Sequence, residues 1–298
     1  IGGRYIHPVG ALVGGVSKPL TAAERERLIE IGKNSVKAAQ FSLKLFTDVV
    51  LKNNAYKDML LSQAYRHETY YMGMVDADNK VNFYDGVVRV VRPDGTELCK
   101  FGPDKYLDVI AEHIEPWTYL KFPYLKPVGW KGFEDGPSSG IYRATPLARL
   151  NVSTGFTTPL AQAEYERYFD FFGGKPVHAT LATHWARLIE LLYAAEHELE
   201  LAQDEEILSQ DVRTIPTATP DEGVGIVEAP RGTLIHHYQT DAQGLLKKVN
   251  LIVGTTNNYA AIDMSIKKAA QSLVLPGKPL NDGILNQIEM AFRAYDPC

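Results

Sequence analysis

The sequence has 298 residues, a net charge of −5 at neutral pH and an isoelectric point near 5.9. This acidic balance argues against general nucleic-acid binding, which needs a basic face. Apolar residues are 45% and charged residues 22% of the chain, so residues 1–298 are expected to fold as one globular domain. No apolar run approaches the roughly 20 residues that span a bilayer, and Cys99 and Cys298 form no disulfide framework. We therefore expect a cytoplasmic protein without membrane contact.

The N-terminal part is predicted to open with irregular backbone and then form a long helix. Residues 1–19 are rich in Gly and Pro, and His7 there is interpreted as a structural residue rather than a metal ligand. Thr21 and Glu24 have the spacing of a capping box, and apolar residues then recur at helical spacing. We therefore predict a helix over residues 21–52.

A β region is predicted to follow this helix. Three segments alternate apolar and polar residues as strands do: 81–85, 87–91 and 96–101. Asp76, Asp78 and Asn79 resemble a calcium loop only superficially, because the glycine and closing glutamate of that motif are missing, and we interpret them as a turn. Cys99 lies on the last strand and is interpreted as a small buried hydrophobe. Residues 104–115 are predicted to form a short helix.

Residues 117–143 are rich in aromatic side chains, glycine and proline. Rings interspersed with Lys121, Lys126 and Lys131 are compatible with binding of single-stranded nucleic acid. They are equally compatible with a long loop that is held to the body of the protein by ring burial. The acidic net charge favours ring burial.

Two amphipathic helices are predicted next, over residues 159–172 and 180–203, followed by a polar connector over residues 204–220. His184 and Glu190 on the second helix invite a metal site. They are six residues apart, whereas helix neighbours are three or four apart, so we interpret this stretch as helix core.

Residues 222–253 are predicted to form a β region that carries the main candidate residue. Gly244 lies in a polar turn between alternating apolar runs, which is a hairpin signal. Pro230 removes a backbone donor, so Arg231 is predicted at a strand end, bulge or edge, and Gly232 permits close backbone approach. Such an arginine points either into a cleft or to the surface in a salt bridge, and composition leaves both open.

Two more helices are predicted over residues 259–275 and 283–294, the second capped by Asn281. The expected fold is therefore an α+β domain that is mainly helical, with long packed helices and two inserted β-hairpin regions.

Several different short motifs are spread along nearly the whole chain. They include residues 227–238 with Glu-Ala-Pro-Arg-Gly, the loop of residues 255–258, and the closing segment 290–298 with Ala-Tyr-Asp-Pro-Cys. Residues 117–124 and 184–190 belong to the same set. Together they resemble the large subunit of nickel–iron hydrogenases, above all the cytoplasmic, methyl-viologen-reducing type. The resemblance implies the same mainly helical α+β fold.

The chain departs from this family in its cysteines. The family binds its metals through two Cys-x-x-Cys pairs, one near each end, and no such pair occurs in this sequence. We therefore expect the chain to be the central portion of a large subunit, truncated at both ends. As given, it is expected to hold no nickel–iron centre and to be inactive, because one thiolate cannot bind two metals.

For the full-length protein, the resemblance implies reversible oxidation of dihydrogen at a nickel–iron centre whose iron carries diatomic ligands. Arg231 matches the arginine that overhangs the open metal position, and Asp296 matches a nearby carboxylate that orders it. Pro230 and Thr255 match positions that line the pocket of the diatomic ligands. Cys298 matches one thiolate ligand.

The resemblance also implies partners, namely an iron–sulfur small subunit plus an electron-transfer subunit, because this sequence has no cluster-binding cysteines of its own. Two alternatives stay open. One is a metal-free interaction module, and the other is a scaffold related to respiratory complex I, against which the closing Asp-Pro-Cys argues. No nucleic-acid or membrane partner is expected.

Overall fold

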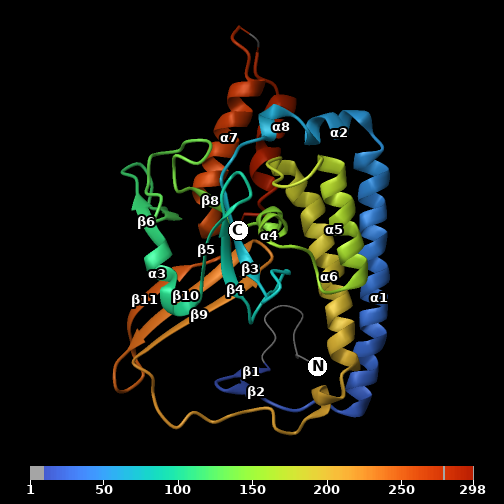
Figure 1. Cartoon of the computed structure of the whole chain (residues 1–298), viewed down its shortest axis with the longest axis vertical. Helices are drawn as coiled ribbons and strands as arrows, with labels where there is room; N and C mark the ends of the chain where they lie inside the picture. Colours follow the sequence, from blue (N-terminus) through green and yellow to red (C-terminus); the bar gives the residue numbers. More distant parts are fainter. Residues whose placement is uncertain (1–9, 278, 298) are drawn as a thin grey trace.

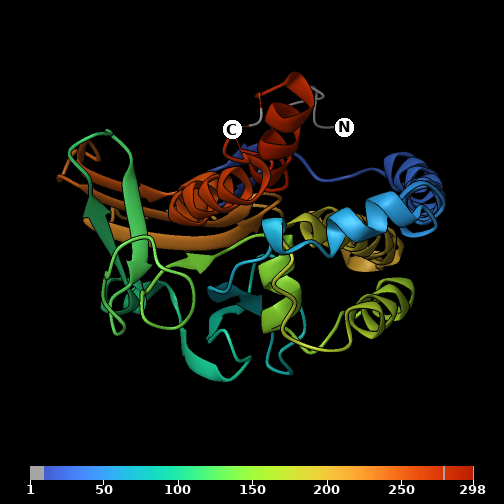
Figure 2. The same cartoon turned by 90° about the horizontal axis from the view of Figure 1, so that it is seen from above.

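The computed structural model describes residues 10–277 and 279–297. Long helices gather on one side of the molecule and sheets on the other, as the two views in Figure 1 and Figure 2 show. This arrangement confirms the predicted α+β class.

The helical side is formed by three long helices. These are α1 (Ala22–Phe46), α5 (Pro159–Phe172) and α6 (Thr183–Gln203). The predicted capping box is present at the start of α1, where Thr21 Oγ1 accepts a hydrogen bond from the Glu24 N–H at 3.2 Å. A π-helical turn (Thr47–Leu51) continues α1, so the helical segment ends close to the predicted residue 52.

Five further helices and several 3-10 turns make up the rest of the helical content of the described residues. The helices are α2 (Asn54–Leu60), α3 (Tyr106–Val109), α4 (Pro146–Val152), α7 (Tyr259–Leu273) and α8 (Asp282–Arg293). The 3-10 turns are Gln63–Tyr65, Pro103–Lys105, Thr180–Ala182, Glu205–Leu208 and Gly254–Asn258. Asn281 caps α8 as predicted, because its side chain accepts a hydrogen bond from the Ile284 N–H at 3.0 Å.

The larger sheets contain three and four strands. The first has the order β11-β10-β9 and is antiparallel, with β9 (Glu222–Ala229), β10 (Gly232–Thr240) and β11 (Leu246–Ile252). The second has the order β5-β4-β3-β8, with β3 (Tyr70–Val75), β4 (Val87–Val91), β5 (Glu97–Phe101) and β8 (Tyr142–Arg143). Small hairpins are formed by β1 (Ala11–Leu12) with β2 (Gly15–Val16), and by β6 (Ile110–Ile114) with β7 (Lys121–Leu125).

Two local predictions are wrong. Residues 81–85 form no strand: Val81 makes only an isolated bridge, and Asn82 Oδ1 instead accepts hydrogen bonds from the N–H groups of Tyr84 and Asp85. The helix predicted over residues 104–115 ends at Val109, where β6 begins and pairs with β7. In both places, local hydrogen bonding or strand pairing overrides the sequence pattern.

Among the described residues, the buried apolar side chains form three clusters, including one around the helices α1, α5 and α6 and one around the strands β3, β4 and β10. The strand β3 and the helix α4 are buried along their whole length and contact each other at the centre. In the 117–143 segment, Phe122 is buried and packs against Trp130 and Phe133, as ring burial predicts. The segment is not one long loop, however, because it contains β7 and β8, and the Tyr119 ring is 95% exposed. Within the described ranges, no helix combines the length and apolarity needed to cross a membrane.

Candidate functional site

The candidate site is built on the two-residue turn between β9 and β10. Ala229 pairs with Gly232, so Pro230 and Arg231 form the turn, as the proline predicts. A Cβ atom on Gly232 would lie 2.5 Å from the carbonyl oxygen of Ala144 and 2.7 Å from that of Gly254. Only glycine therefore allows this close approach of three backbone segments.

The Arg231 side chain reaches the C-terminal segment. Its Nε donates a hydrogen bond to the main-chain oxygen of Asp296 at 2.6 Å and lies 3.3 Å from Asp296 Oδ2. Asp296 adopts a left-handed conformation with φ of 51°, which aspartate tolerates better than most residues. The two side chains are 39% and 48% exposed, so this ion pair by itself adds little stability.

The loop of residues 254–258 fixes the base of the turn. Asn258 Nδ2 donates to the carbonyl oxygen of Arg231 at 3.0 Å, and Asn258 Oδ1 accepts from the Ala144 N–H at 2.8 Å. Thr255 is buried in the same 3-10 turn. The loop thus joins the turn to the chain that leads into α4.

A buried arginine supports the turn from the other side. Arg149 of α4 is 1% exposed, and its Nε and Nη2 each donate to a different carboxylate oxygen of Glu190 at 2.6 Å. Its Nη1 donates to Glu228 Oε2 at 2.9 Å. Nη1 and Nη2 also reach the carbonyl oxygens of Ala229 at 3.0 Å and Pro230 at 3.2 Å. Two carboxylates and two carbonyl groups therefore offset the cost of burying this charge.

The ionisation of this cluster follows from its burial and its partners. Burial raises the pKa of the Glu228 carboxyl, although Arg149 acts in the opposite direction. Burial alone would lower the pKa of Arg149, but Glu190 and Glu228 raise it above the ordinary value of an arginine. The guanidinium is therefore charged at any physiological pH.

Arg187 of α6 connects the turn to the C-terminal segment. Its Nη1 donates to the carbonyl oxygen of Pro230 at 3.0 Å, and its Nη2 donates to that of Ala294 at 3.2 Å. Nη1 also lies 3.8 Å from Asp296 Oδ2. The Pro230 carbonyl thus accepts hydrogen bonds from two arginines.

A cavity of about 350 Å³ lies behind the turn. Four charged side chains form its polar lining: Arg149, Arg187, Glu190 and Glu228. Phe83 and Leu191 contribute to its apolar lining. The cavity places the charged groups next to the backbone that holds Arg231.

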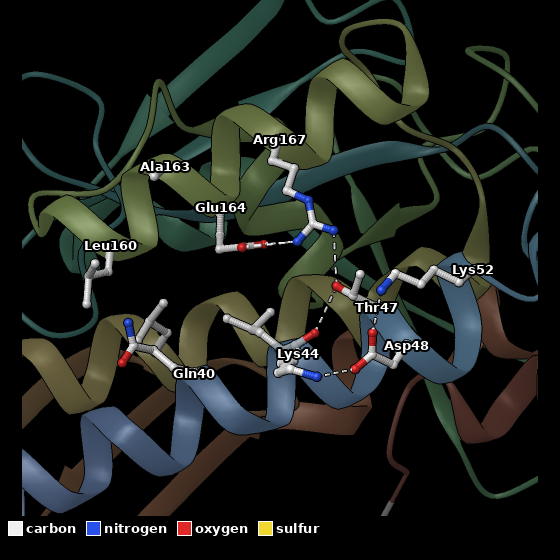
Figure 3. Close-up of a pocket in the computed structure, with 11 residues that line it drawn as sticks. Gln40, Lys44, Thr47, Asp48, Lys52, Leu160, Ala163, Glu164 and Arg167 are labelled. Atoms are coloured by element: carbon white, nitrogen blue, oxygen red, sulfur yellow. Dashed lines mark hydrogen bonds and ion pairs between the residues drawn. The ribbon is translucent and has the colours of Figure 1, made fainter.

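A second hollow, of about 450 Å³, lies between α1 and α5 and shares no residue with the turn (Figure 3). In it, Asp48 lies between Lys44 and Lys52, and Glu164 pairs with Arg167. Both carboxylates are therefore matched by cations of the same surface. This hollow shows no arrangement that singles out a ligand.

The sequence-predicted site residues are partly brought together. Arg231 contacts Asp296, and Pro230 and Thr255 lie in the turn and in the adjoining loop. Cys298 lies outside the described residues. Arg149 and Arg187 were not predicted as site residues, although Arg187 lies within the motif of residues 184–190. The available signals were an arginine inside the otherwise apolar stretch 146–150 and the three-residue spacing of Arg187 and Glu190 on one helix.

The described residues do not fit a nickel–iron centre by themselves. Nickel and low-spin iron are suited by soft thiolate ligands. In the described part of the chain, no three His, Cys, Asp or Glu side chains are grouped to hold a metal. The thiol described there, Cys99, lies half-buried on β5 opposite Val90, and burial raises its pKa, which disfavours a thiolate.

Comparison with known proteins identifies the class. A family model described as nickel-dependent hydrogenase matches residues 139–298, more than half of the chain, and this segment includes the turn, the 254–258 loop and Asp296. The chain belongs to the nickel-dependent hydrogenase family.

Individual relatives agree with this assignment. The chain is 47% identical, over its whole length, to an iron-sulfur subunit of the F420-non-reducing hydrogenase of Archaeoglobus profundus, and 41% identical to a subunit of the F420-non-reducing hydrogenase vhc of Methanococcus voltae. It is also similar to the crystal structure of an NAD+-reducing [NiFe]-hydrogenase in the H2-reduced state. That match has a TM-score of 0.88 and 35% identity, and it covers 98% of this chain and 62% of the other. The chain spans 61% of the length of both curated relatives.

Proposed function

We propose that the full-length protein is the catalytic large subunit of a nickel–iron hydrogenase, which reversibly oxidises dihydrogen to protons and electrons. The observation that carries this proposal is the pairing of Arg231 with Asp296 inside the segment that the family matches. A guanidinium keeps its charge at all physiological pH values, so Arg231 can present a fixed positive charge to a reacting group. Its contacts with Asp296 hold the planar group in one orientation.

In this proposal, Cys298 supplies one thiolate to the metals, and Pro230 and Thr255 line the pocket of the diatomic ligands on the iron. The remaining ligands do not come from the described residues. The work of the described residues is therefore to hold Arg231 and Asp296 in place.

The proposal includes partners. Electrons that leave a buried metal need a relay, so we expect an iron–sulfur small subunit plus an electron-transfer subunit. Several relatives are named as single subunits of F420-non-reducing hydrogenases, which supports a multi-subunit enzyme that reduces methyl viologen in the test tube. A cytoplasmic location stays a prediction, to be tested by cell fractionation.

The test uses the full-length protein, purified together with the proteins that bind it. Elemental analysis is expected to find stoichiometric nickel, together with more iron than nickel because the iron–sulfur partner contributes iron of its own. Hydrogen-dependent reduction of methyl viologen is expected in the same preparation. A complex that contains the partners but no nickel, and that takes up no hydrogen, would instead establish the metal-free scaffold.

A further inference from the structure

We infer that Arg187 is a positioning residue that holds the β9–β10 turn and the C-terminal segment in register. The significance of this bridge for catalysis rests on the proposed function. The bridge itself is a property of the fold and is measurable without any assumption about the reaction.

One guanidinium, that of Arg187, reaches both segments. Arg187 donates to Pro230 at 3.0 Å and to Ala294 at 3.2 Å. Pro230 immediately precedes Arg231, and Ala294 lies close before Asp296 in the sequence. The guanidinium is planar and its N–H groups point in fixed directions. It therefore binds two carbonyl groups and also sets the distance between them. Arg187 therefore fixes the spacing of the two backbones that carry the Arg231–Asp296 pair.

The peptide group between Pro230 and Arg231 is held in one orientation. The Pro230 carbonyl points to Arg149 and Arg187, which lie on α4 and α6. A trans peptide is planar, so the N–H of Arg231 is turned away from these helices. Two arginines on one carbonyl thus fix the direction in which the chain enters Arg231.

Two side chains, Arg231 and Arg187, link the β9–β10 turn to the C-terminal segment. The direct contact of Arg231 with Asp296 involves side chains that are 39% and 48% exposed, whereas the Arg187 side chain is 25% exposed. Hydrogen bonds of a more buried charged group are less weakened by solvent. The Arg187 side chain is therefore the less exposed of the two links.

Arg187 is also the residue that can be tested without unfolding the protein. Removal of the fully buried Arg149 would leave two carboxylates without their partner, whereas the Arg187 guanidinium binds neutral carbonyl groups that water can reach. Arg187→Gln removes the fork, and Arg187→Lys keeps the charge but cannot span both carbonyls. Arg167→Gln on α5, whose guanidinium contacts Glu164, Thr47 and the Trp185 ring rather than the turn, is the control.

The first measurement is hydrogen–deuterium exchange in the full-length protein. Arg187→Gln is expected to raise the exchange rate of amides in residues 229–234 and 293–297 together, roughly tenfold, while Arg187→Lys gives a smaller rise. The Arg167→Gln control is expected to leave both segments unchanged. Unchanged exchange in both segments of Arg187→Gln would overturn the inference.

The second measurement separates positioning from general stability. Arg187→Gln is expected to lower hydrogen uptake per bound nickel roughly tenfold. A merely structural residue would lower nickel content and uptake in step, so uptake per nickel would stay constant, and that result would overturn the positioning role. If the protein is no hydrogenase at all, the proposed function fails in the wild type, while the exchange measurement still reports on the bridge.

Discussion

At the scale of single residues, the proposed chemistry depends on Arg231. Its ion pair is exposed enough to be a common surface contact, and the features that set it apart lie around it. The turn that carries it is held by Asn258, Arg149 and Arg187, and Gly232 leaves no room for a side chain beside it. So many supporting contacts around one half-buried arginine are consistent with a group that must be placed accurately.

Arg231→Lys in the full-length enzyme is expected to lower hydrogen uptake 10²-fold or more while nickel content stays nearly constant. A lysine ammonium keeps the charge but cannot reproduce the planar contacts with Asp296. Nickel content, melting temperature and hydrogen uptake should be measured on the same preparation. Arg293→Lys, which changes an arginine paired with Glu289 on α8, is the matched control. Full activity in a nickel-replete Arg231→Lys protein would remove the catalytic role.

His184 gives a spectroscopic reading of the Arg187 charge. It is an exposed side chain of the groove that also contains Arg187. Desolvation by the groove together with the Arg187 charge lowers the pKa of His184, while Asp296 raises it. Arg187→Gln is therefore expected to raise the pKa of His184, and Arg187→Lys to leave it nearly unchanged. An NMR titration of the histidine ring protons measures both. An identical His184 titration in wild type and Arg187→Gln would show that the two side chains do not interact.

At the scale of elements, the β9–β10 turn depends on one glycine. Gly232→Ala places a methyl group 2.5 Å from a backbone oxygen, so it is expected to destabilise the protein by about 1–3 kcal/mol through overpacking. Gly225→Ala, in the same sheet and with nothing within 4 Å, is expected to change stability by no more than about 0.5 kcal/mol. Urea unfolding of both variants measures the difference. Equal stability would mean that the backbone segments around Gly232 separate easily.

The helix α4 depends on its buried ion cluster. Arg149→Met leaves Glu190 and Glu228 without their partner, and breaking a buried pair in this way costs about 3–5 kcal/mol. Chemical unfolding is the measurement, and Arg293→Met on the exposed face of α8 serves as control. A loss below about 1 kcal/mol would show that water enters the 350 Å³ cavity and solvates both carboxylates.

Local signals predicted the helices well and the strands less well. The capping box at Thr21 and the cap at Asn281 mark helix starts through contacts within a few residues, so sequence spacing is enough to find them. By contrast, β6 exists because Ile110–Ile114 pairs with β7, and its own pattern resembled a helix. A strand is specified by its partner as much as by its residues.

At the scale of the whole molecule, the buried His67 makes the free energy of unfolding depend on pH. His67 is buried, its Nε2 lies 2.7 Å from Ser265 Oγ, and its Nδ1 has no hydrogen-bond partner among the described residues. Burial lowers the pKa of His67 well below its ordinary value, and Arg143 and Lys268 act in the same direction. The folded protein thus keeps His67 neutral at pH values where the unfolded chain binds a proton.

The sign of the pH effect follows from this difference. Below about pH 6.5 the unfolded chain takes up a proton at this position and the folded protein does not, so stability falls as the pH falls, by about 1.4 kcal/mol per pH unit. Above that pH both states are neutral there, and His67 adds no pH dependence. His67→Gln is expected to reduce the slope of unfolding free energy against pH below 6.5, while His197→Gln, on a partly exposed ring, serves as control. An unchanged slope in His67→Gln would show that His67 is protonated in the folded state.

The site could be predicted from the sequence only in part. Motif resemblance pointed to Arg231 and Asp296 because those residues lie within short recognisable segments. The residues that hold them were missed because their contacts join distant parts of the chain. Nothing in the spacing of Arg149 and Pro230, or of Arg187 and Ala294, indicates that they meet.

These separations also bear on the order of events during folding. The contacts of Arg149 with Glu190 and Glu228 span 41 and 79 residues, and that of Arg187 with Ala294 spans 107. Closing such long loops costs chain entropy before any contact compensates for it, whereas the capped helices form from local contacts. The arginine cluster is therefore expected to assemble late, after α6 is in place. Until then Arg231 and Asp296 belong to two independent segments, so their pairing is among the last features of the native state to appear.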